Sequence, residues 1–143
     1  MRVLCYYHCM SNINSVEEAT ELLKKSGFIS LLGIEILELA PKSAKGRMML
    51  AAKYCNPYGS MHGGCLYSLA DTVCGTLANS KGCEVATADG DLRFLEPAAS
   101  TRYVYCEALL KKSGRHLITV AAEITDDNGK LLACGTYTFF RMA

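Results

Sequence analysis

Apolar residues near the start of the chain recur at helical spacing. Ser15 and Glu18 stand in the relation of a capping box, in which a serine begins a helix and a glutamate three positions later supports it. The apolar positions that follow this start are Val16, Ala19, Leu22 and Leu23. The pattern predicts a helix over residues 15–26, ended by Gly27.

The next apolar stretches have the period of strands. Residues 33–40 place apolar side chains around Glu35 and Glu38, Pro41 interrupts the pattern, and residues 45–53 are again rich in apolar residues. Alternation of this kind, broken at a proline, predicts two strands joined by a hairpin.

The middle of the chain is apolar throughout. Residues 63–80 carry a single charged side chain, that of Asp71. A helix without a polar face has to be covered on all sides, so this segment predicts a buried central helix.

The last part of the chain reads as an antiparallel sheet. Ser113-Gly114 and Asn128-Gly129 are tight hairpin signals, and Pro97 marks a looser connection. They separate four runs rich in Val, Ile, Thr, Tyr and Phe, at residues 84–96, 101–112, 115–126 and 130–141. The predicted fold is an α+β domain over residues 1–143, in which a curved antiparallel sheet wraps around the central helix.

Composition narrows the classes of function. The 143 residues are 50% hydrophobic and 20% charged, with 15 basic and 14 acidic residues and a net charge of +1. This balance gives no excess of positive charge to attract a phosphate backbone, so it disfavours nucleic-acid binding. We find neither a signal peptide nor a membrane-spanning segment, and eight unclustered cysteines favour a reducing, cytoplasmic location. Cys5, His8 and Cys9 resemble half of a metal site, but no second ligand pair follows, so we predict no metal.

A glycine-rich loop runs directly into the central helix. Residues 56–64 read Asn-Pro-Tyr-Gly-Ser-Met-His-Gly-Gly. A helix N-terminus offers free N–H groups and partial positive charge, and glycines let a ligand approach them, which suits a developing oxyanion. The GxxxxGK[ST] spacing of a nucleotide loop is absent. The alternative is a tight loop whose glycines only permit packing.

Asp71 is the second candidate. A carboxylate in an apolar helix has to be paired, protonated or turned toward a water-containing cleft. Desolvation would raise its pKa and make it a better base for activating water. The alternative is an aspartate bonded to a backbone or hydroxyl group for structural reasons.

The spacing of these candidates predicts a shared site. His62 and Asp71 are nine residues apart, which on a helix is an axial rise of about 13.5 Å and places them on opposite faces. Catalytic groups must lie within about 3 Å of the reacting atoms, so one chain cannot bring both to one bond. Two central helices packed antiparallel about a two-fold axis would form two equivalent sites in a homodimer.

These residues form a recognisable string. Residues 56–71 have the form N-x-x-x-x-x-H-G-G-x-x-x-x-L-A-D, and Thr87-x-Asp89 and Phe94-Leu95-x-Pro97-Ala98 follow. The arrangement resembles the PaaI-type acyl-CoA thioesterases of the hotdog fold, over residues 28–141. The resemblance implies hydrolysis of an acyl-CoA thioester, with coenzyme A as part of the substrate and no cofactor, in a dimer that often pairs into a dimer of dimers.

The resemblance also implies roles for individual residues. Asp71 would activate water or attack the thioester itself. The Gly63 N–H of the other subunit would bind the thioester oxygen, and Asn56 and His62 would orient its loop. Thr87 would hydrogen-bond the water or Asp71. Residues expected to contact the substrate are Gly64, Tyr58, Leu66 and Phe94.

The sequence departs from the family pattern on one strand. Asp91 and Arg93 stand where the family often has asparagines, and Gly90 replaces an apolar residue. Asp91 and Arg93 share a strand face, so a contact between them is possible. Gly90 suggests a bulge or a close backbone approach.

Other classes of function stay open or fit less well. An acyl-CoA-binding domain without turnover is the main alternative, and the presence of Asp71 favours an enzyme over it. A hotdog hydratase would need a different acid/base spacing, and no GxSxG serine-hydrolase motif exists. Cys65 and Cys74 are better explained as small buried hydrophobes than as nucleophiles. The sequence does not distinguish an aryl from an alkyl acyl group.

Overall fold

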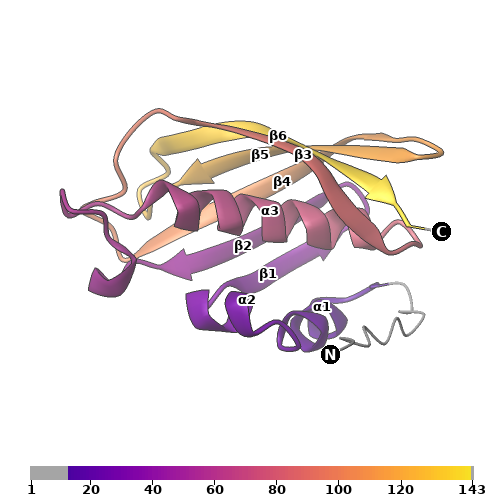
Figure 1. The fold of residues 1–143 in the computed structure, drawn as a ribbon, viewed down its shortest axis with the longest axis horizontal. Helices are drawn as coiled ribbons and strands as arrows, with labels where there is room; N and C mark the ends of the chain where they lie inside the picture. The colour runs from indigo at the N-terminus through magenta and orange to yellow at the C-terminus, as the bar shows by residue number, and fades with distance from the viewer. Residues whose placement is uncertain (1–12, 143) are drawn as a thin grey trace, which may run out of the picture.

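A computed structural model of the protein describes residues 13–142. Its elements are α1 (Val16–Leu23), α2 (Gly27–Leu32), β1 (Glu35–Ala40), β2 (Ser43–Met49), the 3₁₀ helix η1 (Ala52–Tyr54), α3 (Gly63–Asn79), β3 (Val85–Phe94), β4 (Tyr103–Ser113), β5 (Leu117–Thr125) and β6 (Leu131–Arg141). The predicted α+β class is confirmed, with a six-stranded antiparallel sheet curved along α3 (Figure 1). No helix within residues 13–142 has both the length and the apolar character needed to cross a membrane.

The N-terminal segment holds two helices where one was predicted. Ser15 caps α1 as expected, accepting the Glu18 N–H at 3.1 Å. The chain then restarts, because the Ser26 hydroxyl accepts the Ile29 N–H at 3.3 Å and caps α2. Gly27 therefore begins a helix and does not end one, and Gly33, with a φ of 66°, closes α2 in the left-handed conformation.

The first hairpin is confirmed with shorter strands. β1 and β2 pair antiparallel across the turn after Ala40, with Ala40 opposite Ser43. The second strand ends at Met49, and the chain beyond it forms η1, although the apolar run predicted a strand to residue 53. Short apolar runs do not separate strand from helix by composition alone.

The sheet order is β1-β2-β4-β5-β6-β3. The predicted hairpins β4–β5 and β5–β6 are present. β3 is not beside β4, which follows it in sequence; it pairs only with β6, at the far end of the strand order. One edge of β3 therefore has no neighbouring strand within residues 13–142, as Figure 1 shows.

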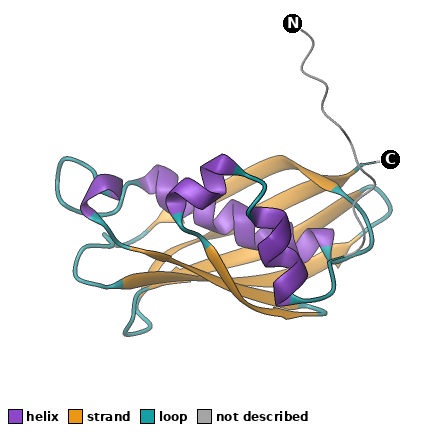
Figure 2. Cartoon of the chain, turned by 90° about the horizontal axis from the view of Figure 1, so that it is seen from below, coloured by secondary structure: helices purple, strands orange, loops and turns teal. Residues whose placement is uncertain are grey.

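The core lies between α3 and the sheet. Leu69 and Leu77 of α3 are fully buried against strand residues that include Val104, Ile118 and Tyr137. Each such side chain stabilises the fold by about 1.5–3 kcal/mol when removed from water. α1 and α2 lie beside the β1 end of the sheet, alongside α3 (Figure 2).

The prediction that α3 is covered on every side holds only for its second half. Residues 73–78 are all buried, whereas Gly64 and Tyr67 in the first half are exposed and Asp71 is half-buried. These three positions are spaced by three and four residues, so they share one face of the helix. This face, which includes the Asp71 carboxyl, is only partly covered by residues 13–142.

Candidate functional site

Asn56 organises the loop that leads into α3. Its Oδ1 accepts the Tyr58 N–H at 2.9 Å and the Ser60 N–H at 3.2 Å, and its Nδ2 donates to the Ser60 Oγ at 3.0 Å. The backbone closes the same turn, with the Asn56 N–H donating to the Ser60 carbonyl at 2.8 Å. The side chain thus satisfies amides that would otherwise have no partner in an irregular loop.

His62 and Gly63 form the start of α3. His62 is the N-cap, and its Nδ1 accepts the Gly64 N–H at 2.9 Å. Accepting this bond requires an unprotonated Nδ1. The Gly63 N–H has no protein partner among residues 13–142, as is usual for the first amides of a helix. A Cβ on Gly63 would stand 3.2 Å from the Phe94 ring, so the glycine keeps this amide accessible beside an aromatic face.

One cavity gathers four of the predicted residues. A hollow of about 400 Å³ is lined by Asn56, Gly63, Leu66 and Phe94. Tyr58, also predicted to contact substrate, is 92% exposed on the loop and lines none of the cavities described here. The helix N-terminus therefore opens onto a partly apolar hollow large enough for a small ligand.

Asp71 and Thr87 meet at a different place. The Thr87 Oγ1, on β3, donates to the Asp71 Oδ1 at 2.8 Å. Burial raises the pKa of the Asp71 carboxyl above its ordinary value, and this hydrogen bond lowers it again in part. The two residues line a second, smaller chamber of about 180 Å³. A half-buried carboxylate with a free second oxygen is suited to accept a proton or to attack a carbonyl.

The structure does not bring the Gly63 amide and the Asp71 carboxyl together within one chain. Gly63 is the first residue of α3 and Asp71 is its midpoint, eight residues on, an axial rise of about 12 Å. The angular part of the sequence argument is wrong, because His62 precedes the helix and does not take part in its rotation. The axial separation remains, and the two sets of residues line separate cavities.

The unusual residues of β3 have structural explanations. Asp91 and Arg93 form the predicted contact, with Arg93 Nη1 donating to Asp91 Oδ1 at 2.9 Å. Gly90 marks a close approach: a Cβ there would stand 2.2 Å from the Tyr67 hydroxyl oxygen and 2.8 Å from the Tyr137 ring. The Tyr67 hydroxyl donates to the Gly90 carbonyl at 3.1 Å, which ties β3 to α3 one turn before Asp71.

Neither cysteine of α3 has the surroundings of a nucleophile. Cys74 is fully buried, and burial raises the pKa of its thiol far above the ordinary value. Burial also raises the pKa of the Cys65 thiol. Among residues 13–142, no group of three or more His, Cys, Asp or Glu side chains is arranged to hold a metal ion. Cys5, His8 and Cys9 lie outside the described residues.

The sequence analysis missed the contribution of the N-terminal helices. Leu22 and Leu23 of α1 and Ile29 of α2 line the chamber that contains Asp71. The helical spacing of Leu22 and Leu23 predicted burial but gave no indication of what they would face, and Ile29 lies beyond the predicted helix. A contact between α1 and the middle of α3 depends on the tertiary arrangement and leaves no local signal.

Comparison with known proteins gives a consistent result. The profile of the Thioesterase superfamily matches residues 58–133, more than half of the chain. Acyl-coenzyme A thioesterase 13 from Homo sapiens is 26% identical over 133 residues, covering 90% of this chain and 95% of that protein. Acyl-coenzyme A thioesterase PaaI from Escherichia coli K12 is 26% identical over 117 residues, covering 82% of this chain and 84% of that protein.

Solved structures agree with this. A mutant of the phenylacetic acid degradation protein PaaI from Thermus thermophilus superposes with a TM-score of 0.76 at 29% identity, covering 82% of this chain and all of that one. The architecture is thus that of the hotdog proteins, as the sequence resemblance implied. The chain belongs to the Thioesterase superfamily.

Proposed function

We propose that the protein is an acyl-CoA thioesterase that hydrolyses an acyl-CoA thioester to the free acid and coenzyme A. The observation that carries the proposal is Asp71, a half-buried carboxylate with a raised pKa, which is held by Thr87 and lines a chamber with one apolar side. Family membership and the thioesterase names of the relatives support the same reaction.

In this mechanism Asp71 acts on the thioester carbon in one of two ways. As a general base it takes a proton from water while the water oxygen attacks the carbonyl carbon. As a nucleophile its own oxygen attacks, and the resulting mixed anhydride is then hydrolysed. In both routes the carbon–sulfur bond breaks and coenzyme A leaves as a thiolate that takes up a proton.

The carbonyl oxygen gains negative charge in both routes, and we assign its stabilisation to the Gly63 N–H at the start of α3. This amide has no protein partner among residues 13–142 and lies at the positive end of a helix of 17 residues. Asn56 and His62 hold the loop that presents it, through the bonds to Tyr58, Ser60 and Gly64.

The proposed site joins the two cavities across a homodimer. The open edge of β3 and the exposed face of α3 lie next to each other in the single chain. Antiparallel pairing of β3 with a partner's β3 would continue the sheet and set the two α3 helices side by side. With the two-fold axis near Tyr67, midway between Gly63 and Asp71, the start of one helix lies beside the middle of the other. Pairing of two dimers remains a prediction of the sequence resemblance.

The test is hydrolysis of acyl-CoA esters followed by release of free thiol. We expect Asp71→Asn to lower kcat/KM by a factor of about 100 or more, because an amide neither accepts the proton nor attacks the carbonyl. The matched control is Asp126→Asn in the β5–β6 turn, where the Oδ1 accepts the Asn128 and Lys130 N–H groups and an amide oxygen would accept the same bonds. Unchanged turnover in Asp71→Asn would refute the assignment. Binding of acyl-CoA without turnover in the unaltered protein would instead favour the non-catalytic alternative.

A further inference from the structure

The chamber next to Asp71 has one apolar side, and polar residues of α3 and β3 line the other. Leu22, Leu23 and Ile29 form one side of it. On the other side, two polar side chains are satisfied within α3: the Thr76 Oγ1 donates to the Thr72 carbonyl at 2.8 Å, and the Asn79 Nδ2 donates to the Gly75 carbonyl at 3.0 Å. The side formed by α1 and α2 is suited to contact an uncharged hydrocarbon group.

The size of the chamber limits that group. Its volume of about 180 Å³ is close to the roughly 150 Å³ of an apolar cavity that takes up one benzene molecule in another protein. An acyl group of about six carbon atoms, alkyl or aryl, matches this space.

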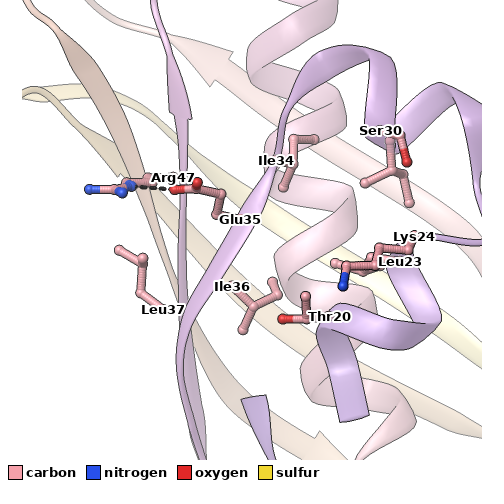
Figure 3. A pocket seen from close by; sticks show the side chains of 10 residues that line it. Thr20, Leu23, Lys24, Ser30, Ile34, Glu35, Ile36, Leu37 and Arg47 are labelled. Atoms are coloured by element: carbon pink, nitrogen blue, oxygen red, sulfur yellow. Dashed lines mark hydrogen bonds and ion pairs between the residues drawn. The ribbon is translucent and has the colours of Figure 1, made fainter. Parts of the chain in front are cut away.

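A larger cavity lies on the other side of Leu23 and Ile29. It has a volume of about 460 Å³ and lies between α1, α2 and β1. Figure 3 shows Ile34 and Ile36 on the side of β1 that faces the two helices. Its charged residues are paired, Lys24 with Glu21 at 2.7 Å and Arg47 with Glu35 at 2.6 Å.

Leu23 and Ile29 line both cavities and so form the wall between them. Both side chains are only partly buried and pack against the edge of the core. Leu23 ends α1 and Ile29 belongs to α2, so the wall is made by the two short N-terminal helices.

We propose that Leu23 and Ile29 close the end of the acyl chamber and set the longest acyl chain that the protein accepts. This inference rests on the proposed function, since it takes the acyl group to extend from the thioester carbon at Asp71 toward α1. Beyond the wall, the larger cavity provides room for a longer hydrocarbon once the wall is removed.

The experiment measures kcat/KM for acetyl-, butyryl-, hexanoyl-, decanoyl- and palmitoyl-CoA. In the unaltered protein we expect the value to rise by about fourfold per methylene up to hexanoyl-CoA and to fall for decanoyl-CoA, because each buried methylene contributes about 0.8 kcal/mol only while there is space for it. Leu23→Ala and Ile29→Ala should raise the decanoyl-to-hexanoyl ratio by a factor of about ten or more. Leu23→Trp should lower the ratio of hexanoyl-CoA to acetyl-CoA hydrolysis, because a larger side chain shortens the chamber.

Leu31→Ala is the matched control, because Leu31 is on α2, is exposed and lines neither cavity. It should leave the chain-length profile unchanged. Circular dichroism and thermal unfolding establish that each variant is folded. A profile identical to that of the unaltered protein in folded Leu23→Ala, Ile29→Ala and Leu23→Trp would overturn the inference.

A second measurement separates this inference from the proposed function. S-alkyl-CoA thioethers cannot be hydrolysed, so their affinities report the chamber alone. A cut-off near a six-carbon alkyl chain that moves in Leu23→Ala supports the chamber even if the protein hydrolyses no acyl-CoA, in which case only the reaction is wrong. Hydrolysis of acyl-CoA without such a cut-off refutes the chain-length limit set by Leu23 and Ile29 but is consistent with the proposed reaction. If the protein neither binds the thioethers nor hydrolyses acyl-CoA, both the inference and the proposed function are refuted.

Discussion

At the scale of single residues, the pair Asp71 and Thr87 determines the ionisation of the site. Burial raises the pKa of the carboxyl, and the hydroxyl at 2.8 Å opposes this by stabilising the charged form. In the proposed reaction, the ionised carboxylate is the active form both as base and as nucleophile. Activity should therefore be lost as the pH falls through the pKa of Asp71.

Thr87→Val tests this balance. Removing the hydroxyl takes away the interaction that lowers the pKa of Asp71, so the pKa rises further and the acidic limb of the kcat/KM profile moves to higher pH. Rates at high pH should fall less than rates at low pH. The measurement is the pH dependence of acyl-CoA hydrolysis.

Thr119→Val on β5 is the control for this profile, because Thr119 alternates with the buried Ile118 and Val120 and so points away from α3. Its acidic limb should coincide with that of the unaltered protein. An acidic limb that stays in place or moves to lower pH in Thr87→Val would show that the hydrogen bond does not set the ionisation of Asp71.

At the scale of elements, β3 is fixed to α3 by aromatic side chains that leave no room for a side chain at Gly90. The Tyr67 and Tyr137 rings lie 5.2 Å apart between centroids, and the Tyr137 hydroxyl donates to the Tyr67 carbonyl at 3.2 Å. Tyr67 in turn donates to the Gly90 carbonyl. The glycine that departs from the family pattern is thus a condition for this contact.

Gly90→Ala should destabilise the fold by about 1–3 kcal/mol, the usual range for overpacking, because both rings would have to move. Urea denaturation at fixed protein concentration measures the change. Gly27→Ala is the control, since a Cβ there meets nothing within 4 Å. It should change the free energy of unfolding by no more than about 0.5 kcal/mol. Equal stability of the two variants would contradict the close contact.

The elements that sequence predicted correctly are those with local signals. The central helix, the β1–β2 turn after Ala40 and the hairpin at Asn128-Gly129 follow from apolar spacing and turn chemistry. The division of the N-terminal helix at Ser26 was missed because its serine cap competes with a glycine that also marks helix ends. The position of β3 beside β6 was not predictable, since strand order depends on contacts between residues far apart in the chain.

The residues of the candidate site also divide into those with a local sequence signal and those without one. Asp71 was identified because a lone charge in an apolar helix is conspicuous, and its bond to Thr87 was suggested by the family resemblance and is present in the structure. Leu23 and Ile29 carry no such signal, because apolar side chains in a short helix predict packing whatever they pack against. Their roles follow only from the tertiary structure.

At the scale of the whole molecule, the proposed site needs two sets of residues that lie apart within one chain. Asn56 and Gly63 line one cavity and Asp71 and Thr87 line the other. Complementation between inactive chains tests whether a dimer joins them. Asp71→Ala and Asn56→Ala chains should each be inactive, and mixing them should restore roughly a quarter of the activity, because half of the randomly formed dimers contain one intact site of two.

The control mixes Asp71→Ala with Thr87→Ala chains. These two changes fall in the same half of the site, so no mixed dimer contains an intact site and the activity should equal the mean of the two separate proteins. Native mass spectrometry verifies subunit exchange in both mixtures. Proven exchange without recovery in the first mixture would rule out a site shared between chains.

The open edge of β3 has a further consequence for how newly made chains avoid one another. A long strand with one unpaired edge is a template on which copies of the chain can stack without limit. A parallel in-register stack would place Asp89 over Asp89 and Asp91 over Asp91 at every layer, about 4.8 Å apart. This repulsion opposes fibril growth, whereas one antiparallel pairing about a two-fold axis does not require such repetition. In the proposed homodimer, the acidic residues of β3 would thus protect a chain against aggregation until it pairs with its partner.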